Sequence, residues 1–352
     1  MFLTTDRYKI FFEKPDFAYL ADFLENTCKA KEVVVVADEN TASQCLPLIR
    51  PVLEKKGFEL FTFPAGEDHK NMETTLRLWQ EMMDRQIRRN TLVINLGGGV
   101  VTDLGGFCAA VFKRGLPFIH IPTSLLCMLD AAVGSKTGVD FSGQKNMIGT
   151  FTDPQAVFIY PGFLETLPAD HLRAGMAEAW KHALIDNRGL WCLLRDGGTD
   201  KYERLIFKSL EIKRKIVDRD PKEMGERKKL NFGHTAGHAF ESWYLNQGKS
   251  PIHHGDAVAA GMIVESYLSW KTGKLEKSVF DEIRDSLRQS FPHLSIPLSD
   301  IPVLLQYMAN DKKKDQDKLN FVLLEDIGEA IINQCVEESL VTESLSYYLS
   351  LF

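Results

Sequence analysis

The sequence predicts an α/β N-terminal domain with a mostly parallel sheet, followed by a mainly α-helical domain. Over the first 160 residues, short apolar runs alternate with amphipathic stretches, which is typical of β-α units. From residue 170 to residue 310 the apolar residues recur at a spacing of about 3.6, which is typical of helices. The chain has 352 residues, which is enough for two domains.

Five short runs rich in β-branched and aromatic residues are the strand candidates of the first half. They are 33–37, 59–63, 92–96, 118–122 and 157–160. Two stretches between them, 42–55 and 72–87, have helical periodicity.

The texture of the sequence changes after Pro161, where β-branched runs almost disappear. Only 319–324 and 329–332 are late strand candidates, and they could form a hairpin across the turn Asp326-Ile-Gly328. We therefore predict two domains, 1–160 and 161–352, with a packed interface and a cleft between them.

Composition excludes several classes of protein. Apolar residues make up 44% and charged residues 26% of the chain, which is close to the average of globular proteins. A net charge of -6 gives no footprint for nucleic acid or for an anionic membrane, and no apolar run reaches the length of a membrane helix. The six cysteines are scattered without a disulfide or zinc-ribbon spacing, and the charged N-terminus does not resemble a signal peptide, so we expect a cytoplasmic protein.

Polar loops follow three strand candidates. Consecutive glycines, Gly97, Gly98 and Gly99, follow the run 92–96 and open a helical stretch, and such a turn can either cradle a phosphate or simply be tight. Asp38 and Asn40 follow the first candidate strand, while Glu67 and Lys70 follow the second. Because open α/β sheets bind ligands beyond the carboxyl ends of their strands, these loops together indicate a dinucleotide site.

The histidines of the second half raise the question of a metal. His234 and His238 lie at i, i+4, His253 and His254 follow, and Glu178 stands close to His182 in an earlier helix. A catalytic zinc site needs about three nitrogen or oxygen ligands, and several triples are available here. A zinc peptidase is disfavoured because Thr235 stands where the base glutamate of the paired-histidine motif would be.

A third group is basic. Lysines and arginines stand beside glycine, asparagine or aspartate at positions along the whole chain, and each alone could be ordinary surface charge. Together they suit an anionic, sugar-like substrate, since arginine and lysine can hold phosphate and carboxylate groups. The group comprises Arg114, Lys136, Lys145, Lys181, Lys213, Arg227 and Lys312.

An ordered set of motifs places these residues in a known context. The motifs are Gly97-Gly-Gly-Val-Val-Thr-Asp103, Lys113-Arg-Gly115, Ile121-Pro-Thr-Ser-Leu125, Asp130, Gly134-Ser-Lys-Thr137, Lys145-Asn-Met-Ile-Gly149, Phe163-Leu-Glu-Thr-Leu-Pro168, Gly175-Met-Ala-Glu-Ala-Trp-Lys181, Leu230-Asn-Phe-Gly-His-Thr-Ala-Gly-His238, His254-Gly-Asp256 and Asp311-Lys312. Over nearly the whole chain, this set closely resembles the 3-dehydroquinate synthase family of the sugar phosphate cyclase superfamily.

The resemblance implies an NAD- and zinc-dependent lyase of the shikimate pathway, with cobalt as an alternative metal. Such an enzyme cyclises 3-deoxy-D-arabino-heptulosonate 7-phosphate to 3-dehydroquinate with phosphate release, and the same NAD removes and returns a hydride. The resemblance also implies the family's fold, an NAD-binding α/β domain followed by a helical metal- and substrate-binding domain.

Residue by residue, the resemblance places the zinc ligands at Glu178, His234 and His254. It places the cofactor at Asp38, Asn40, Glu67, Lys70, Gly97, Gly98, Gly99, Asp103, Thr123, Ser124, Lys145, Phe163 and Thr166. Positions near the substrate phosphate are Lys136, Asn146, Asn231 and His238, positions for its carboxylate and hydroxyl groups are Lys213, Arg227 and Lys312, and further contacts are Asp130 and Lys181. Arg114 matches an arginine that reaches in from a partner subunit, which implies a homodimer.

The sequence departs from the family pattern at four positions, each by a small or conservative change. Ser135 stands for a usual glycine and Ser124 for a usual threonine, Gln144 precedes Lys145, and Asp256 replaces a usual glutamate. Two enzyme alternatives stay open: a sister cyclase acting on sedoheptulose 7-phosphate or a related sugar phosphate, and a metal-dependent oxidoreductase of the glycerol dehydrogenase type. The cluster of Arg227, Lys213 and Lys312 argues for a substrate that carries a carboxylate. A non-catalytic dinucleotide-binding protein is a further alternative, which would neither bind stoichiometric zinc nor turn over.

Overall fold

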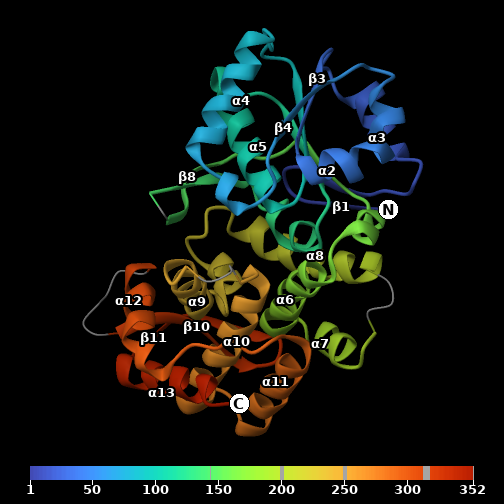
Figure 1. The fold of residues 1–352 in the computed structure, drawn as a ribbon. Helices are drawn as coiled ribbons and strands as arrows, with labels where there is room; N and C mark the ends of the chain where they lie inside the picture. The colour runs from blue at the N-terminus through green and yellow to red at the C-terminus, as the bar shows by residue number, and fades with distance from the viewer. Residues whose placement is uncertain (143, 199–201, 249–251, 312–317, 352) are drawn as a thin grey trace. The chain divides into compact units, whose positions relative to one another are not determined.

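A computed structural model describes residues 1–142, 144–198, 202–248, 252–311 and 318–351 (Figure 1). The chain divides into two compact units, Met1–Pro168 and Ala169–Phe352. Each unit buries an extensive set of apolar side chains.

The N-terminal unit is built on a seven-stranded sheet in the order β1-β2-β9-β6-β5-β3-β4. Its strands are β1 (Phe2–Thr4), β2 (Lys9–Phe12), β3 (Val33–Asp38), β4 (Glu59–Phe63), β5 (Leu92–Gly97), β6 (Phe118–Pro122) and β9 (Ala156–Ile159). β1 and β2 pair antiparallel, and the remaining neighbours pair parallel. The central strands β5 and β6 are buried along their whole length, which explains why they are continuous apolar runs rather than alternating ones.

Helices cover both faces of this sheet (Figure 1). α1 (Ala18–Asp22), α2 (Glu39–Gln44) and α3 (Leu46–Leu53) pack together on one face, whereas α4 (Met72–Asp84) and α5 (Gly99–Val111) pack on the other. From β3 to β4 the chain moves one way across the sheet, and from β4 through β5 to β6 it moves the other way. Because crossovers between parallel strands are right-handed, the helices of the two stretches lie on opposite faces. Alternate residues of β3 and β4, such as Val34 and Phe61, form a core with Leu78 of α4 and Leu104 of α5.

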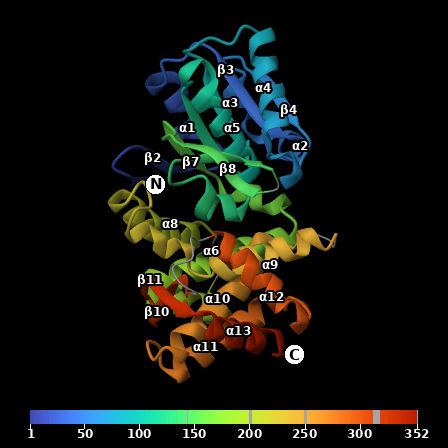
Figure 2. The ribbon, with the colours of Figure 1, turned by 90° about the vertical axis from the view of Figure 1, so that its left-hand side faces the viewer.

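A separate hairpin, β7 (Lys136–Phe141) and β8 (Gln144–Phe151), packs on α5 (Figure 2). Gly138 and Gly149 face each other across it, and a Cβ on Gly149 would lie 2.3 Å from the carbonyl oxygen of Thr137. Short helical turns fill the connections: η1 (Phe23–Thr27), η2 (Glu67–His69), η3 (Phe112–Arg114), η4 (Cys127–Ala131) and η5 (Pro161–Thr166).

The C-terminal unit is a helical assembly around α10 (His254–Lys271), whose residues from Gly255 to Ser269 are all buried. Around it are α6 (Ala169–Asp186), α7 (Arg188–Arg195), α8 (Tyr202–Arg219), η6 (Glu226–Asn231), α9 (His234–Asn246), α11 (Lys277–Ser290), η7 (Leu298–Asp300), α12 (Ile301–Asp311) and α13 (Glu338–Leu349). A hairpin of β10 (Lys318–Asp326) and β11 (Glu329–Glu337) packs beside α10 and α6. Small residues along α10 allow its neighbours to approach closely.

The predicted fold class is confirmed: a mostly parallel α/β sheet is followed by a mainly helical unit. All five strand candidates of the first half are strands, and the predicted late hairpin turns at Gly328, which has a φ of 94°. The predicted helix 42–55 is instead two helices that meet at Cys45, and Pro47 lies in the first turn of the second. In the described part of the chain, no helix has the length and apolar character needed to cross a membrane.

Candidate active site

The glycine segment forms the turn between β5 and α5. Gly97 ends the strand and Gly98 is the N-cap of the helix, so the segment has no side chain with which to cap it. A Cβ on Gly97 would lie 2.4 Å from Cγ2 of Val101, and a Cβ on Gly98 would lie 3.3 Å from Oγ of Ser124. The turn therefore leaves backbone exposed at the positive end of a helix dipole, which suits a phosphate group.

A charged cluster lies beside this helix in the same unit. The buried ammonium of Lys70 forms an ion pair with Asp103 at 2.7 Å and donates to Oδ1 of Asn146 at 2.7 Å. Glu67 lies 4.0 Å from Lys70 and 3.9 Å from Lys145. Burial lowers the pKa of Lys70, but the neighbouring carboxylates of Asp103 and Glu67 outweigh burial and raise this pKa above its ordinary value, so Lys70 is charged. Five predicted site residues, taken from three separate segments, thus share one cluster.

The other predicted residues of this unit are more dispersed. The carboxylate of Asp38 caps α2, accepting from the N–H of Thr41 at 2.8 Å, while Asn40 is exposed in the same helix. The N–H of Thr123 donates to the carbonyl of Gly97 at 3.0 Å, which joins the ends of β5 and β6. Asp130 lies close enough to Asp103 to raise the pKa of that carboxyl, although burial of Asp103 is the larger cause.

Four more predicted positions in this unit differ in exposure. Phe163 is buried and Thr166 is exposed, both in η5. Lys136, at the start of β7, and Arg114, at the end of η3, are exposed.

In the C-terminal unit the structure brings three predicted ligands together. Donor atoms of Glu178, His234 and His254 all lie within 4.8 Å of one another. They come from α6, α9 and α10, so three helices contribute one ligand each. Both oxygens of Glu178 are buried and accept no hydrogen bond from the described residues, although Oε2 forms an ion pair with the ammonium of Lys181. Burying a carboxylate whose lone pairs accept no hydrogen bond destabilises the folded protein unless a cation binds those oxygens, so this site fits a metal ion.

The histidine rings are oriented for coordination. Nδ1 of His234 lies 3.2 Å from the carbonyl oxygen of Phe232, to which it can donate, and Nε2 lies 3.8 Å from Oε1 of Glu178. Burial lowers the pKa of His234 well below its usual range, with help from the charge of Lys181, so this ring is neutral. A neutral ring whose Nδ1–H is bonded keeps the Nε2 lone pair for a metal.

Close helix crossings place these ligands. A Cβ on Gly255 would lie 1.8 Å from the carbonyl oxygen of Ala174, so α10 touches the backbone of α6 one residue after His254. The guanidinium of Arg173 also binds Asp256 through two hydrogen bonds of 3.2 and 2.9 Å. The departure to aspartate at position 256 therefore still provides the partner that joins α6 to α10.

The start of α9 is held in the same way. A Cβ on Gly261 of α10 would lie 1.9 Å from the carbonyl oxygen of Gly233, the residue before His234. The buried carboxylate of Glu265 accepts from the N–H groups of Gly233 at 2.8 Å and Thr235 at 3.2 Å. A glutamate of α10 thus caps α9 and fixes the residue between its two contacts, His234.

Two other triples of metal-ligating type occur among the described residues of this unit. His238, Glu241 and His254 form one, and it shares a histidine with the first. Asp170, His171 and His253 form the other, but it is largely exposed and lies at the N-termini of α6 and α10, near Arg173. The carboxylate of Asp170 is exposed and solvated, whereas both oxygens of Glu178 are buried and lack a hydrogen bond from the described residues. The triple with Glu178 is therefore the best metal site of the three.

The remaining predicted residues are buried cations and their neighbours. Lys181, Lys213 and Arg227 are each less than 4% exposed and lie on α6, α8 and η6, which pack on one another. Nδ2 of Asn231 donates to Glu223 at 2.5 Å, and the ring of His238 lies edge-on to that of His234 with the ring centroids 5.4 Å apart. Lys312 lies outside the described residues.

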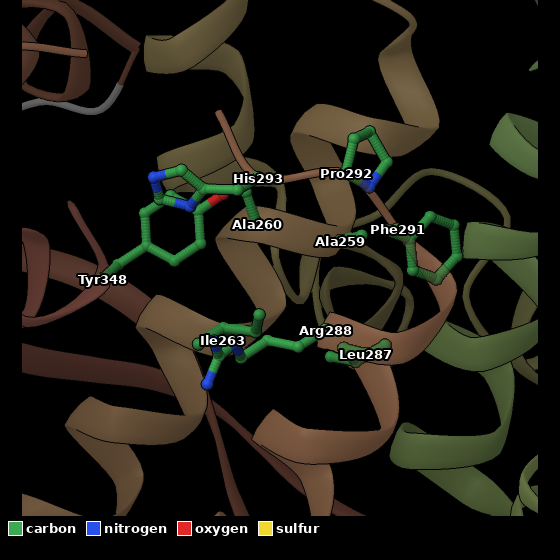
Figure 3. Close-up of a pocket in the computed structure, with 9 residues that line it drawn as sticks. All are labelled: Ala259, Ala260, Ile263, Leu287, Arg288, Phe291, Pro292, His293 and Tyr348. Atoms are coloured by element: carbon green, nitrogen blue, oxygen red, sulfur yellow. The ribbon is translucent and has the colours of Figure 1, made fainter. Parts of the chain in front are cut away.

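Sequence reasoning missed Glu241 and Glu265, which hold the ligand-bearing residues. Glu241 could have been found, because it lies at i+7 from His234 and so shares its helix face. Glu265 could not, because its partner segment is remote in sequence. A shallow pocket elsewhere in the unit, lined by residues such as Arg288, His293 and Tyr348, contains none of the predicted site residues (Figure 3).

This combination of fold and site defines a class of two-domain, metal-dependent proteins. Solved structures with the same fold include a 2-deoxy-scyllo-inosose synthase, a 2-epi-5-epi-valiolone synthase and iron-containing alcohol dehydrogenases. A 2-epi-5-epi-valiolone synthase from Streptomyces hygroscopicus, with NAD⁺ and Zn²⁺ bound, superposes with a TM-score of 0.85 at 27% identity over 98% of each chain. An NADH-dependent butanol dehydrogenase from Thermotoga maritima has a TM-score of 0.66 at 15% identity over 98% of each chain, which shows the fold alone.

Sequence comparison narrows the class. The family model of the 3-dehydroquinate synthase N-terminal domain matches residues 60–174, and that of the C-terminal domain matches residues 175–314. A 3-dehydroquinate synthase of Parabacteroides distasonis is 39% identical over 95% of both chains, and one of Clostridium beijerinckii is 37% identical over 88% of this chain and 90% of the relative. The chain belongs to the 3-dehydroquinate synthase family.

Proposed function

We propose that this protein converts 3-deoxy-D-arabino-heptulosonate 7-phosphate to 3-dehydroquinate and phosphate, with NAD and zinc as cofactors, in the shikimate pathway. The observation that carries the proposal is the triple of Glu178, His234 and His254, with its buried glutamate, in a chain of this family. The proposed roles of the domains are NAD binding for 1–160 and metal and substrate binding for 161–352.

The two cofactors have suitable positions in this chain. Glu178, His234 and His254 would hold the metal, and the backbone at Gly97–Gly99, with the cluster around Lys70, would hold the dinucleotide. When bound, zinc polarises the hydroxyl to be oxidised and NAD⁺ accepts its hydride. Lys181, in contact with Glu178, adds a fixed positive charge beside the metal ligands, which favours an anionic oxygen there.

The buried cations support a substrate with several negative charges. Lysine and arginine are seldom fully buried, yet Lys181, Lys213 and Arg227 are buried on three packed elements. We propose that Arg227 and Lys213 bind the carboxylate and hydroxyl groups and that Asn231 and His238 lie near the phosphate. Such charges orient the substrate and cost little to rearrange during the reaction, because they are already held by the fold.

We further propose a homodimer in which Arg114 reaches the partner's active site. Three consecutive residues, Lys113, Arg114 and Gly115, have φ values of 50°, 67° and 111°, so the backbone presents this arginine in a rarely populated conformation. Phe141, Met147 and Phe151 of the β7–β8 hairpin are more than half exposed, which supports a contact surface on this unit. All six cysteines are free, which supports the proposed cytoplasmic location.

The function is tested by measuring phosphate release from the purified protein with NAD⁺ and Zn²⁺. One assay contains 3-deoxy-D-arabino-heptulosonate 7-phosphate and a second contains sedoheptulose 7-phosphate. We expect release from the acid alone and no net NADH. Release only from sedoheptulose 7-phosphate would make the protein a sister cyclase, and net NADH without phosphate would make it a dehydrogenase.

The carboxylate role is tested with Arg227→Ala. We expect this variant to lose at least about 100-fold in kcat/KM on the acid, because a charge-assisted bidentate contact is removed. Arg219→Ala is the matched control, since Arg219 lies nearby at the end of α8 but its side chain is 58% exposed and pairs with Glu226. Equal activities of the two variants would contradict the assignment.

A further inference from the structure

Glu241 makes the polar contact from which this inference starts. Its Oε2 lies 3.1 Å from Nδ1 of His254, which is hydrogen-bond distance for a ring N–H and a carboxylate. The carboxylate of Glu241 is only 10% exposed, and the ring of His254 is 28% exposed. The contact is therefore shielded and joins α9 to α10.

Two roles for Glu241 fit this distance. It could be a metal ligand, in the triple with His238 and His254, or it could hold His254 for the triple with Glu178. A zinc-bound nitrogen and oxygen, each about 2 Å from the metal, are also roughly 3 Å apart, so the distance alone does not separate the roles.

The contacts of the neighbouring residues His234, His254 and Glu178 distinguish these two roles of Glu241. His234 places Nδ1 against a backbone carbonyl and presents Nε2 to Glu178. His254 places Nδ1 against Glu241, so Nε2 is the nitrogen that it can offer to the triple with Glu178. The two histidines then offer the same nitrogen in the same tautomer. Glu178 has two buried oxygens without a hydrogen bond from the described residues, whereas Glu241 has an oxygen engaged by a ring nitrogen.

We propose that Glu241 is a positioning residue: it holds His254 as the Nε2 donor of the Glu178–His234–His254 metal site and is not itself a ligand. The carboxylate fixes the tautomer and the rotation of the ring and makes the coordinating nitrogen more basic. This inference rests on the proposed function only in that a metal occupies the site.

The test is a metal titration of the apoprotein, which does not depend on turnover. Zinc affinity is measured by competition with a chromophoric chelator for the unchanged protein, Glu241→Ala and Glu241→Gln. We expect Glu241→Ala to weaken zinc binding by about 10- to 100-fold, as the loss of an outer hydrogen-bond partner usually does. Glu241→Gln keeps an oxygen that accepts from Nδ1–H, so we expect it to bind more tightly than the alanine variant.

The visible spectrum of bound Co²⁺ distinguishes a ligand from a positioning residue. We expect the band positions in Glu241→Gln to match those of the unchanged protein, because the set of coordinating atoms stays the same. Shifted bands, or a glutamine variant as weak as the alanine variant, would overturn the proposal in favour of a coordinated or purely electrostatic carboxylate. An unchanged affinity in Glu241→Ala would overturn it as well.

Glu282→Ala is the matched control. Glu282 accepts from the ring N–H of Trp191 at 2.8 Å, so this variant removes the same kind of contact from the same unit outside the metal cluster. We expect its zinc affinity to be unchanged, and circular dichroism checks that all variants are folded. If phosphate release fails while this zinc series holds, the proposed substrate is wrong and the role of Glu241 stands.

Discussion

Ser135 adopts a left-handed backbone conformation with a φ of 66°, directly after Gly134 at 115°. The family usually has a second glycine at this position, and the positive φ supplies the reason, since glycine alone adopts it without steric cost. Here the serine Oγ contacts the carboxylate of Asp153, and a local hydrogen bond of this kind offsets part of the strain. Serine in place of glycine at position 135 therefore adds a hydrogen bond to the loop while the backbone keeps the left-handed conformation.

His254→Ala tests the metal site at the level of one ligand. Because one of three ligands is removed, we expect zinc affinity to fall by more than about 100-fold while residues 1–168 stay folded. Zinc content after dialysis, measured by atomic absorption, checks this. His171→Ala removes a histidine from the exposed triple and should leave the content unchanged. Full zinc retention in His254→Ala, or loss of zinc in His171→Ala, would show that the metal binds at a different site.

His120 makes a pH-dependent contribution to stability. Burial lowers the pKa of His120 to about 3, from an ordinary value of 6.5 in the unfolded chain. The stability of the neutral buried ring is therefore fully present above pH 6.5 and is lost as the pH falls toward 3. At about pH 5, this group should cost the folded state about 2 kcal/mol relative to pH 7.

Urea unfolding of the unchanged protein and of His120→Asn at both pH values checks this prediction. The difference between the two proteins isolates His120, because the opposite contribution of Glu13, whose pKa burial raises to about 7, is common to both. An equal loss of stability in the two proteins between pH 7 and 5 would mean that folding does not lower the pKa of His120.

At the scale of elements, α6 and α10 cross closely in the C-terminal unit. A Cβ on Gly255 would meet the carbonyl oxygen of Ala174 at 1.8 Å, so Gly255→Ala must separate the helices that carry Glu178 and His254. We expect a loss of at least about 2 kcal/mol in stability together with weaker zinc binding. Thermal unfolding and the chelator competition measure the two effects.

Gly189→Ala is the control for that substitution. Gly189 also lies in a helix of the same unit, but the nearest atom to its added Cβ would be a side-chain atom of the same helix end, Oδ1 of the N-cap Asn187, at 3.3 Å rather than 1.8 Å. Alanine favours a helix by up to about 1 kcal/mol over glycine, so this variant should be neutral or slightly stabilised. A similar loss in both variants would mean that the crossing is not specifically tight.

Element prediction succeeded where a segment carries its own pattern. The buried parallel strands are continuous apolar runs, and α4 has an asparagine N-cap at Asn71. The β7–β8 hairpin was not predicted, because most of β8 is exposed and its pairing depends on packing against α5. The strands β1 and β2 and the helix α13 were also missed, since they are defined by contacts with β9 and α10.

At the scale of the whole molecule, each cofactor should stabilise its own unit. Zinc should slow amide hydrogen exchange in residues 169–352, and NAD⁺ should do so in residues 1–168. At a free concentration of 100 times Kd, each ligand contributes about 2.7 kcal/mol to the protein that binds it. Exchange measured by mass spectrometry resolves the two regions. Zinc protection confined to the N-terminal unit would contradict the proposed division of roles.

A shared active site makes a prediction about mixed dimers. Arg114→Ala and Lys181→Ala should each be inactive, but co-refolded subunits should form heterodimers that have one intact site. With random pairing, half of the dimers are mixed and half of their sites are intact, so about a quarter of the full activity should return. Phosphate release is measured on the mixture and again on heterodimers isolated with two affinity tags, for which about half of the full activity is expected because one of their two sites is intact. Confirmed heterodimers without activity would exclude an arginine donated by the partner.

The fold class, the family and the set of chemical groups follow from the amino-acid sequence alone, because periodicity and local motifs depend on neighbouring residues. The family resemblance also implies Glu178, His234 and His254 as metal ligands. How those groups are held depends on the three-dimensional packing. Gly255 against Ala174, Glu265 at the start of α9 and Glu241 on His254 are contacts between helices, and their geometry depends on packing that no local pattern encodes.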